Sequence, residues 1–230
     1  MSEFNRLCLS AGIPNPMLLF VGGGNMASAL INGCVKSGIL VLAVKPQSRH
    51  EVFDSVVSKG VSLGSCPIVI SILAGISTTV LQKELSAIGC RGPLIRLMPN
   101  TAAAIGASAS IFSVPRGATV EMMEIVENLA SKVGMCLDVD SKNFNAYAAI
   151  AGSAPAWAYM FIESLADGGV LAGCSRETAL KLAAQSVMGA AQMVLATGEH
   201  PAALKDKICS PGGTTISGLR KLEESGILNI

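Results

Sequence analysis

The sequence predicts an α/β protein in which an N-terminal Rossmann-like parallel sheet is followed by an all-helical region. Over the first 140 residues, short apolar runs of strand length alternate with segments of helical character. A glycine-rich turn directly follows the first of these runs. Beyond residue 140 the composition changes to an alanine-rich helical pattern. These three observations place a domain boundary near Asp140.

The pattern of apolar residues locates the individual elements. Met17–Val21 is predicted as a buried strand, residues 22–24 as a tight turn, and Asn25–Ser37 as a helix that Gly38 closes. Four further runs have strand length: Ile39–Val44, Ile68–Leu73, Pro93–Met98 and Val133–Val139. Helices are then expected over Lys142–Ile150, Pro155–Ala172, Arg176–Thr197, Pro201–Ile208 and Thr215–Glu224. We therefore expect a loose N-terminal arm over residues 1–16, a dinucleotide-binding domain over 17–140 and a helical domain over 141–230.

Composition narrows the classes of function. Half of the 230 residues are hydrophobic and 14% are charged, which fits buried parallel strands, close-packed helices or an oligomer interface. Apolar stretches such as Met17–Val21 fall far short of the roughly 18 residues that a membrane helix needs, so no membrane partner is expected. A net charge of +1, without a basic stripe, argues against nucleic acid. No secretory leader is visible, and we expect a cytoplasmic protein.

Cysteine and histidine usage favours chemistry carried out by a bound cofactor. The seven cysteines are scattered without a Cys-x-x-Cys pair and are predicted to be reduced thiols. Two histidines, His50 and His200, give little material for a metal site or a Ser-His-Asp triad. We therefore predict no metal.

The turn after the first strand has the spacing of a dinucleotide-binding fingerprint. Gly22, Gly24 and Ala27 form a Gly-x-Gly-x-x-Ala string between a strand and a helix, where a pyrophosphate would lie on the helix N-terminus. Asn25 can equally be a simple helix cap. Later strands end in short polar loops, and ligands of open parallel sheets lie along that edge. These loops are Lys45-Pro46-Gln47, Ala74-Gly75-Ile76 and Pro99-Asn100-Thr101.

A second glycine-rich loop, Cys209–Thr215, lies between two predicted helices. A helix N-terminus carries unpaired amides and a partial positive charge, and adjacent glycines let an anion approach the backbone closely. Thr214 and Thr215 add hydroxyls beside such an anion, which suits a substrate with a carboxylate and a nearby nitrogen. A capped turn between two helices explains the same residues equally well.

Six ordered motifs resemble those of the pyrroline-5-carboxylate reductase family. They are Gly22–Ala27, Ala43–Gln47, Ser71–Gly75, Met98–Thr101, Ala151–Ala156 and Ser210–Thr215. The resemblance runs from about Leu18 to Gly226, and the last motif is the most specific. It implies NADPH- or NADH-dependent reduction of 1-pyrroline-5-carboxylate to L-proline, and a homodimer or higher homo-oligomer formed through a helical substrate-binding and dimerisation domain.

The same resemblance assigns roles to residues. The substrate carboxylate is expected on the loop at Ser210, Gly212, Gly213 and Thr214, and Thr215 is expected to hydrogen-bond the ring nitrogen as the catalytic residue. Cofactor contacts are expected from Gly22, Gly24, Asn25, Met26, Ala27, Ala43, Val44, Lys45, Pro46, Ala74, Gly75 and Asn100.

This chain departs from the family pattern at Gly38–Ile39, where about one further β-α-β unit is expected. The missing unit carries the loop that reads the adenosine ribose or its 2′-phosphate. Without the resemblance, Lys45 and Arg49 would be candidate 2′-phosphate ligands. Keeping every remaining element in place would require a left-handed crossover, which is rare. Either the first helix changes face, or the first strand becomes an exposed edge and half of the nucleotide site is lost.

Two competing functions follow from the same residues. One is a weak or inactive truncated paralogue that dimerises through its helical domain, and saturable NAD(P)H binding would separate it from an enzyme. The other is a dehydrogenase of the β-hydroxyacid or ketopantoate type, which shares the N-terminal fingerprint but not the Ser210–Thr215 loop.

Overall fold

The computed structural model describes residues 2–14, 16–21, 38–61, 63–64 and 66–226. By its internal contacts the chain divides into two compact units, Met1–Pro155 and Ala156–Ile230. The boundary expected near Asp140 stays a prediction. The contacts divide the chain later because the helix α6 (Phe144–Ala148) and the π-helical turn η3 (Ala149–Ser153) pack on the first unit through Phe144 and Ala151.

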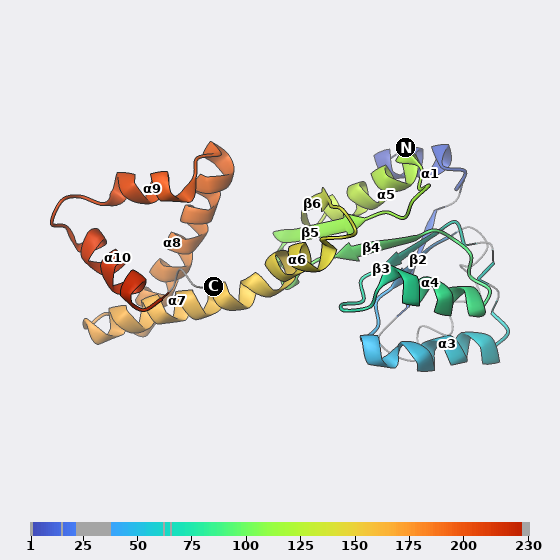
Figure 1. The fold of residues 1–230 in the computed structure, drawn as a ribbon, viewed down its shortest axis with the longest axis horizontal. Helices are drawn as coiled ribbons and strands as arrows, with labels where there is room; N and C mark the ends of the chain where they lie inside the picture. The colour runs from blue at the N-terminus through green and yellow to red at the C-terminus, as the bar shows by residue number, and fades with distance from the viewer. Residues whose placement is uncertain (1, 15, 22–37, 62, 65, 227–230) are drawn as a thin grey trace. The chain divides into compact units, whose positions relative to one another are not determined.

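The first unit contains a six-stranded sheet whose strands lie in the order of the sequence (Figure 1). Neighbouring strands pair in parallel except at one place, where the fourth and fifth strands are antiparallel. The expected α/β class with a largely parallel sheet is confirmed. The strands are β1 (Met17–Val21), β2 (Gly38–Leu42), β3 (Ile68–Ser71), β4 (Leu94–Met98), β5 (Ser108–Ser113) and β6 (Gly134–Asp138).

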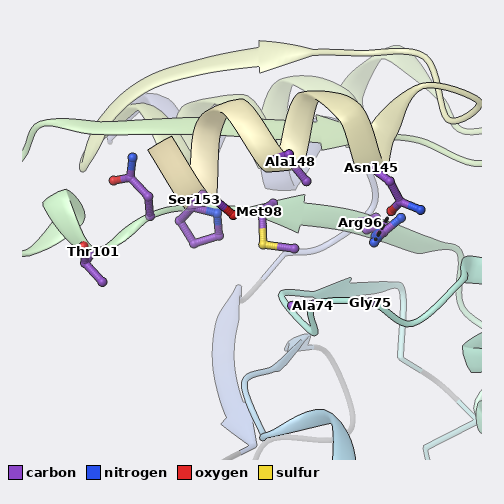
Figure 2. Close-up of a pocket in the computed structure, with 12 residues that line it drawn as sticks. Ala74, Gly75, Arg96, Met98, Thr101, Asn145, Ala148 and Ser153 are labelled. Carbon is purple, nitrogen blue, oxygen red and sulfur yellow. Dashed lines mark hydrogen bonds between the residues drawn. The ribbon is translucent and has the colours of Figure 1, made fainter. Parts of the chain in front are cut away.

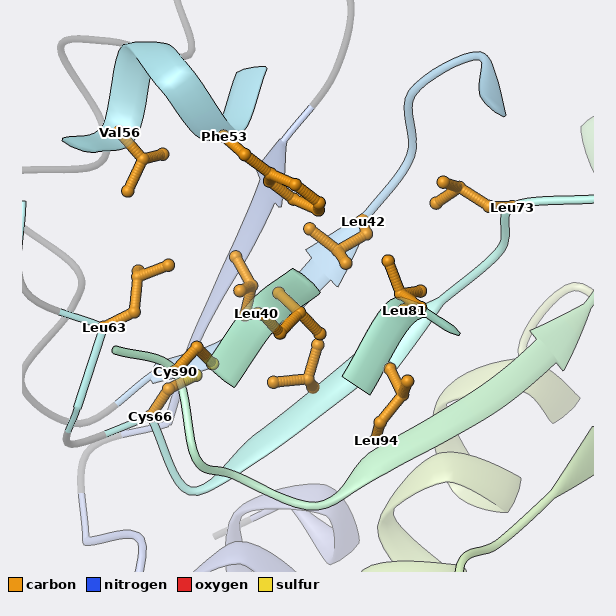
Figure 3. Packing of buried hydrophobic residues seen from close by; sticks show 12 residues of the cluster. Leu40, Leu42, Phe53, Val56, Leu63, Cys66, Leu73, Leu81, Cys90 and Leu94 are labelled. Carbon is orange, nitrogen blue, oxygen red and sulfur yellow. The ribbon is translucent and has the colours of Figure 1, made fainter. Parts of the chain in front are cut away.

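Helices cover both faces of this sheet. On one face, α3 (Arg49–Ser58) and α4 (Thr78–Ala87) pack over β2, β3 and β4 through Phe53, Val56, Leu81 and Leu85 (Figure 3). On the other face, α1 (Glu3–Ser10) and α5 (Val120–Ser131) pack against the alternate strand residues. Strand residues alternate between faces, so Leu40 and Leu42 enter the first core while Ile39 and Val41 enter the second.

Residues 2–14, in the stretch expected to be a loose arm, contain the helix α1. Ser2 caps α1 by accepting a hydrogen bond from the backbone N–H of Asn5, and Glu3 lies favourably in the first turn. Cys8 and Ile13 are buried in the core beside α5. The sequence analysis did not use the signal that this helix carries, because Phe4, Leu7, Cys8 and Ala11 have the spacing of one helix face and pack into the core.

β5 was also missed. Its sequence, Ser-Ala-Ser-Ile-Phe-Ser, is typical of a polar loop, yet its serines at 108, 110 and 113 are buried. The Ser108 and Ser110 hydroxyls lie 3.0 Å apart, and Ser108 Oγ accepts a hydrogen bond from the backbone N–H of Asn100. These hydrogen bonds satisfy the buried hydroxyls of Ser108 and Ser110, so the strand tolerates serine at both positions.

β1 lies at an edge of the sheet and pairs only with β2 among the described residues. Met17 and Leu18 are 38% and 36% exposed. The second of the two alternatives, an exposed first strand, therefore describes this sheet. The helix expected over residues 25–37 and the face of the sheet on which it lies fall outside the described residues. Two short 3-10 turns follow β2 and β4, namely η1 (Pro46–Ser48) and η2 (Thr101–Ile105).

The second unit is helical, as expected. It contains most of α7 (Ala154–Leu171), together with α8 (Arg176–Thr197), α9 (Pro201–Ile208) and α10 (Thr214–Glu224). α7 and α8 pack closely through small residues, because a Cβ added at Gly169 would lie 3.1 Å from Ala179 Cβ. Large apolar side chains stay exposed, with Leu171 at 92% and Leu195 at 74%. An apolar surface of this kind in a helical unit is typical of an interface.

Within the described residues, one helix, α8, is long and apolar enough to cross a membrane on length and composition alone. Its most apolar window is 11% buried. The sequence analysis considered only unbroken apolar runs, which are short. The alanine-rich helix α8 reaches membrane length only when hydropathy is averaged over a window that includes its polar residues. A helix whose apolar side chains are covered by a second copy of the chain is equally rich in apolar residues, so composition alone does not distinguish the two environments.

Candidate active site

A cavity of about 580 Å³ lies at the carboxyl ends of β3 and β4, within the first unit. One wall is the Ala74-Gly75 turn after β3, and the opposite wall is formed by α6 and η3 (Figure 2). The floor is the end of β4 with the Pro99-Asn100-Thr101 loop. Its volume is in the range of small-molecule sites, and its position is where open α/β sheets bind ligands.

Two of the loops expected to share a sheet edge therefore meet in one cavity. Ala74, Gly75 and Asn100 line it, as the sequence analysis expected of neighbouring strand ends. Ala43, Val44, Lys45 and Pro46 follow β2, the next strand in the sheet, and are not among the residues that line it. Their cofactor role stays a prediction.

Arg96 is the charged residue of the cavity wall. It lies in the middle of β4, where its neighbours Ile95 and Leu97 face the opposite core, and it is 8% exposed. Its guanidinium stacks on the Phe144 ring at 4.1 Å, and Nη2 donates to Asn145 Oδ1 at 3.0 Å. Nε is buried without a hydrogen-bond partner. Burial lowers the pKa of Arg96, although a guanidinium stays charged at neutral pH.

Asn100 connects the floor of the cavity to the π-helical turn. Its Nδ2 donates to the Ala151 carbonyl at 2.8 Å, and its Oδ1 accepts from the backbone N–H of Ala102 at 3.0 Å. In an α-helix the Ala151 carbonyl would accept from residue 155, but Pro155 has no N–H. The Asn100 side chain supplies the donor that the proline lacks, and so fixes η3 beside the cavity.

The loop before α10 belongs to the second unit. Gly212 has φ of +69°, a conformation that favours glycine, and the Gly213 N–H donates to the Ser210 carbonyl at 3.1 Å. α10 begins at Thr214 with Gly213 as its N-cap, without a side-chain cap and without an acidic residue in the first turn. Thr214 and Thr215 are exposed. The N-terminus of α10 is therefore exposed, and the anion-binding role that the sequence analysis expects of this loop stays a prediction.

The two residues that were alternative 2′-phosphate ligands, Lys45 and Arg49, have different surroundings. Arg49 is held by Glu84, with Nε to Oε2 and Nη2 to Oε1 both at 2.9 Å, and it also donates to the Pro46 carbonyl. This bidentate pair ties α3 to α4. Lys45 is exposed at the end of β2. Arg49 thus has a structural role.

The fingerprint residues Gly22, Gly24, Asn25, Met26 and Ala27 lie outside the described residues. Sequence reasoning missed four residues that line the cavity, of which Arg96 and Asn145 are polar and Ala148 and Ala149 are apolar. One signal was available for the first, because a lone arginine interrupts the apolar strand Leu94–Met98. Asn145 carried no such signal, since a single amide in a short helix is common.

Comparisons with known proteins agree with this architecture. Residues 141–230 match a family model described as pyrroline-5-carboxylate reductase dimerisation. A pyrroline-5-carboxylate reductase of Arabidopsis thaliana is 44% identical over 202 residues, which cover 88% of this chain and 71% of the relative. The reductase of Methanosarcina acetivorans is 36% identical over 253 residues, covering 93% of this chain and 92% of the relative. That alignment is longer than this chain, so the relative contains segments that the chain lacks.

Solved structures give the same result. The crystal structure of Plasmodium falciparum pyrroline carboxylate reductase with NADP bound is 28% identical, with a TM-score of 0.78, and the match covers 98% of this chain and 86% of that one. The reductase of Streptococcus pyogenes matches with a TM-score of 0.72 and 29% identity, covering 99% of this chain and 89% of that one.

A largely parallel sheet with a cavity at its carboxyl edge, followed by a helical unit, defines a two-part oxidoreductase of the dinucleotide-dependent class. Within that class, the chain belongs to the pyrroline-5-carboxylate reductase family.

Proposed function

We propose that this chain reduces 1-pyrroline-5-carboxylate to L-proline with NADPH or NADH, the last step of proline biosynthesis. The observation that carries the proposal is the cavity in which the loops after β3 and β4 meet. Relatives that share this architecture are pyrroline-5-carboxylate reductases, and one of them holds NADP in its crystal structure.

The residues present fit the nicotinamide end of the cofactor. Ala74 and Gly75 have little or no side chain, so a flat ring can approach their backbone, and Asn100 fixes the floor of the cavity. The pyrophosphate would lie at the Gly22–Ala27 turn, outside the described residues. The relatives' additional segments have no counterpart here, and β1 lies at the sheet edge.

Little catalytic chemistry is required of the protein. When bound, the reduced nicotinamide supplies a hydride to the carbon of an imine that is already electrophilic once protonated. The residues of the chain must orient the imine, hold its carboxylate and exclude water. We propose that Thr215 hydrogen-bonds the ring nitrogen, and that Ser210, Gly212, Gly213 and Thr214 hold the carboxylate at the open N-terminus of α10.

The role of Thr215 is tested by the matched pair Thr215→Ala and Thr215→Ser. Both keep the backbone, but only the serine keeps the hydroxyl. L-proline formation by the alanine variant should fall by about 10- to 100-fold, as for loss of one positioned hydrogen bond, while the serine variant keeps most of the activity. Equal rates for the alanine variant and the unmodified protein would reject this role.

Assembly is the second part of the proposal. The match to a dimerisation model and the exposed apolar helices indicate homo-oligomerisation. We propose a homodimer as the basic assembly, with larger rings built from it. Cytoplasmic location stays a prediction.

A further inference from the structure

Two cysteines from different loops meet in the core beneath α3 and α4. Cys66 precedes β3, Cys90 follows α4, and both are free thiols in this structure. The sequence contains no Cys-x-x-Cys pair, so only the fold brings these two together. We propose that Cys66 and Cys90 form a redox-sensitive pair, which a hydroperoxide converts to a disulfide and a small dithiol restores.

The two side chains are in contact. Cys66 is 6% exposed, Cys90 is 0% exposed, and both belong to the same buried cluster. Figure 3 shows them side by side below Leu63, and a side-chain hydrogen bond joins the two thiols. A lone buried cysteine acts as a small apolar side chain, whereas two thiols in contact meet the first requirement of a disulfide.

The backbones that carry the two cysteines also approach closely. The loops that contain them lead into β3 and β4, which are parallel neighbours, and the Val69 N–H donates to the Pro93 carbonyl at 3.0 Å. A Cβ added at Gly92 would lie 2.3 Å from the Cys66 carbonyl oxygen, so glycine is required there. Neighbouring strands are about 4.8 Å apart, and Cα atoms in disulfides are roughly 4.4–6.8 Å apart. This approach favours a disulfide without a large rearrangement.

The surroundings of the two thiols give them different roles. The hydrogen bond with Cys66, opposed by burial and supported by the backbone N–H of Gly92, lowers the pKa of Cys90. The hydrogen bond with Cys90, together with burial, raises the pKa of Cys66. Because the thiolate is the reactive form of cysteine, Cys90 reacts first with the oxidant and Cys66 is the resolving thiol.

A hydroperoxide is the class of oxidant that suits this buried pair, because it is small and loops open locally at a lower free energy than core strands. The Cys90 thiolate attacks one oxygen of hydrogen peroxide and becomes a sulfenic acid, and the hydroxide that leaves is protonated to water. The Cys66 sulfur then attacks the Cys90 sulfur. The S–S bond forms as the S–O bond breaks, and the leaving hydroxide takes the Cys66 proton. Two thiols lose two electrons, and one peroxide becomes two water molecules.

The disulfide closes the segment β3–α4–β4 at the end of the sheet opposite the cavity. Cys66 and Cys90 precede the amino ends of β3 and β4, whereas the cavity lies at the carboxyl ends of these strands. A bond between them restricts the unfolded chain over the residues that it encloses. The oxidised protein is therefore more stable than the reduced protein, and the cavity is not altered.

The test uses the full chain and the variants Cys66→Ala, Cys90→Ala and Cys8→Ala. Cys8 is as buried as Cys90 but lies in the core on the other face of the sheet, so its variant is the matched control. Each protein is treated with hydrogen peroxide, alkylated in denaturant and digested, and its peptides are identified by mass spectrometry. Melting temperatures are measured before treatment, after treatment, and again after dithiothreitol.

In the unmodified protein and in Cys8→Ala we expect a peptide in which Cys66 and Cys90 are joined. The melting temperature should rise by at least about 5 °C, the order of effect of a native disulfide in a unit of this size. Dithiothreitol should reverse both changes. Neither change should occur in Cys90→Ala or in Cys66→Ala, and the latter should accumulate sulfinic acid at Cys90 because the resolving thiol is missing.

Three results would overturn the proposal. In the unmodified protein these are free Cys66 and Cys90 after peroxide treatment, sulfinic acid at Cys90 in place of a disulfide, and disulfides that join either residue to another cysteine. A Cys66–Cys90 disulfide that leaves the melting temperature unchanged would overturn the stabilising effect.

Discussion

At the residue scale, the cavity depends on a few polar side chains with defined partners. Arg96 and Asn145 meet on one wall, and Asn100 joins the floor to η3. The hydrogen-bond partner of Arg96 is a neutral amide, and that of the Asn100 side chain is a neutral carbonyl. A single substitution at Asn145 or Asn100 can therefore change the charge or the donor in each hydrogen bond. Stability measurements on these residues therefore report on the cavity directly.

Asn145→Asp should raise the free energy of unfolding by about 1 kcal/mol, because a charge-assisted hydrogen bond is stronger than a neutral one and Arg96 is already desolvated. The new carboxylate would have a folded pKa below its unfolded value of about 4, so the gain is present above that pH and is lost as the pH falls through the folded pKa. Denaturant unfolding at pH 7 measures the gain in the free energy of unfolding, and the same experiment at pH 3 measures its loss in acid. A loss of stability at pH 7 would contradict the uncompensated state of Arg96.

Glu84 gives a second pH prediction. The hydrogen bond from Arg49 lowers the pKa of Glu84, so this pair stabilises the fold above the unfolded pKa of about 4.3 and ceases to do so as the pH falls through the folded pKa. The melting temperature of Glu84→Gln should therefore lie below that of the unmodified protein at pH 7, and the gap should close in acid. A gap that stays constant with pH would show that the charge of Glu84 is not involved.

At the element scale, the π-helical turn and the edge strand are the features with functional consequences. The turn lies just before Pro155, which cannot donate to the Ala151 carbonyl, and Asn100 donates to that carbonyl instead. Among the described strands β1 lies at the edge, so none of them lies beyond it to support the adenosine end of a dinucleotide.

Asn100→Asp tests the turn. The substitution keeps an acceptor for the Ala102 N–H but removes the donor to Ala151, leaving two acceptors facing each other. The free energy of unfolding should fall by about 1–3 kcal/mol, the usual cost of an unsatisfied buried polar group. Ser108→Ala, which removes a neighbouring hydroxyl but leaves the Asn100 side chain intact, is the control and should not alter hydrogen exchange in residues 149–155.

From the edge position of β1 we predict how strongly the protein distinguishes NADH from NADPH. Because the part of the family pattern that reads the adenosine ribose is missing, NADH and NADPH should bind with dissociation constants within about threefold of each other, a difference of less than 1 kcal/mol. Reduced nicotinamide mononucleotide should retain most of the affinity of NADH. Fluorescence titration with the three ligands measures this. A strong preference for NADPH would mean that a 2′-phosphate site exists elsewhere in the chain.

Strand and loop positions were predictable where the pattern was strong. The parallel strands, the helices beyond residue 140 and the meeting of Ala74, Gly75 and Asn100 followed from apolar runs and from the rule that strand ends share an edge. α1 was not predicted although its apolar residues have helical spacing, and β5 was not predicted because its serines become compatible with a buried strand only through tertiary hydrogen bonds. Asn145 became visible only when packing brought it into contact with Arg96, 49 positions away in the sequence.

At the scale of the whole molecule, the helical unit has too little core to account for its apolar residues. Its buried cluster consists of Ala166, Ala179 and Ala183, while leucines and methionines of α7 and α8 are exposed. Together with the dimerisation family match, this indicates that a second copy covers these helices.

Leu182→Glu tests that assembly. Leu182 is 63% exposed on α8, and glutamate keeps the helix propensity of leucine, so the fold should persist. We expect the dissociation constant of the oligomer to rise at least tenfold in sedimentation experiments, with unchanged helicity. Lys181→Glu, at an exposed ion-paired position next to it, is the control. Equal effects of the two substitutions would argue against an interface at Leu182.

The most direct test of the account is a single-turnover reaction in which the purified protein, mixed with reduced nicotinamide cofactor, is given 1-pyrroline-5-carboxylate. The cofactor absorbance and the amount of L-proline formed are followed together. We predict that cofactor oxidation and L-proline appear in equal amounts with either NADH or NADPH. A folded oligomer that binds the cofactor poorly and forms no L-proline would contradict the account and identify the chain as an inactive member of its family.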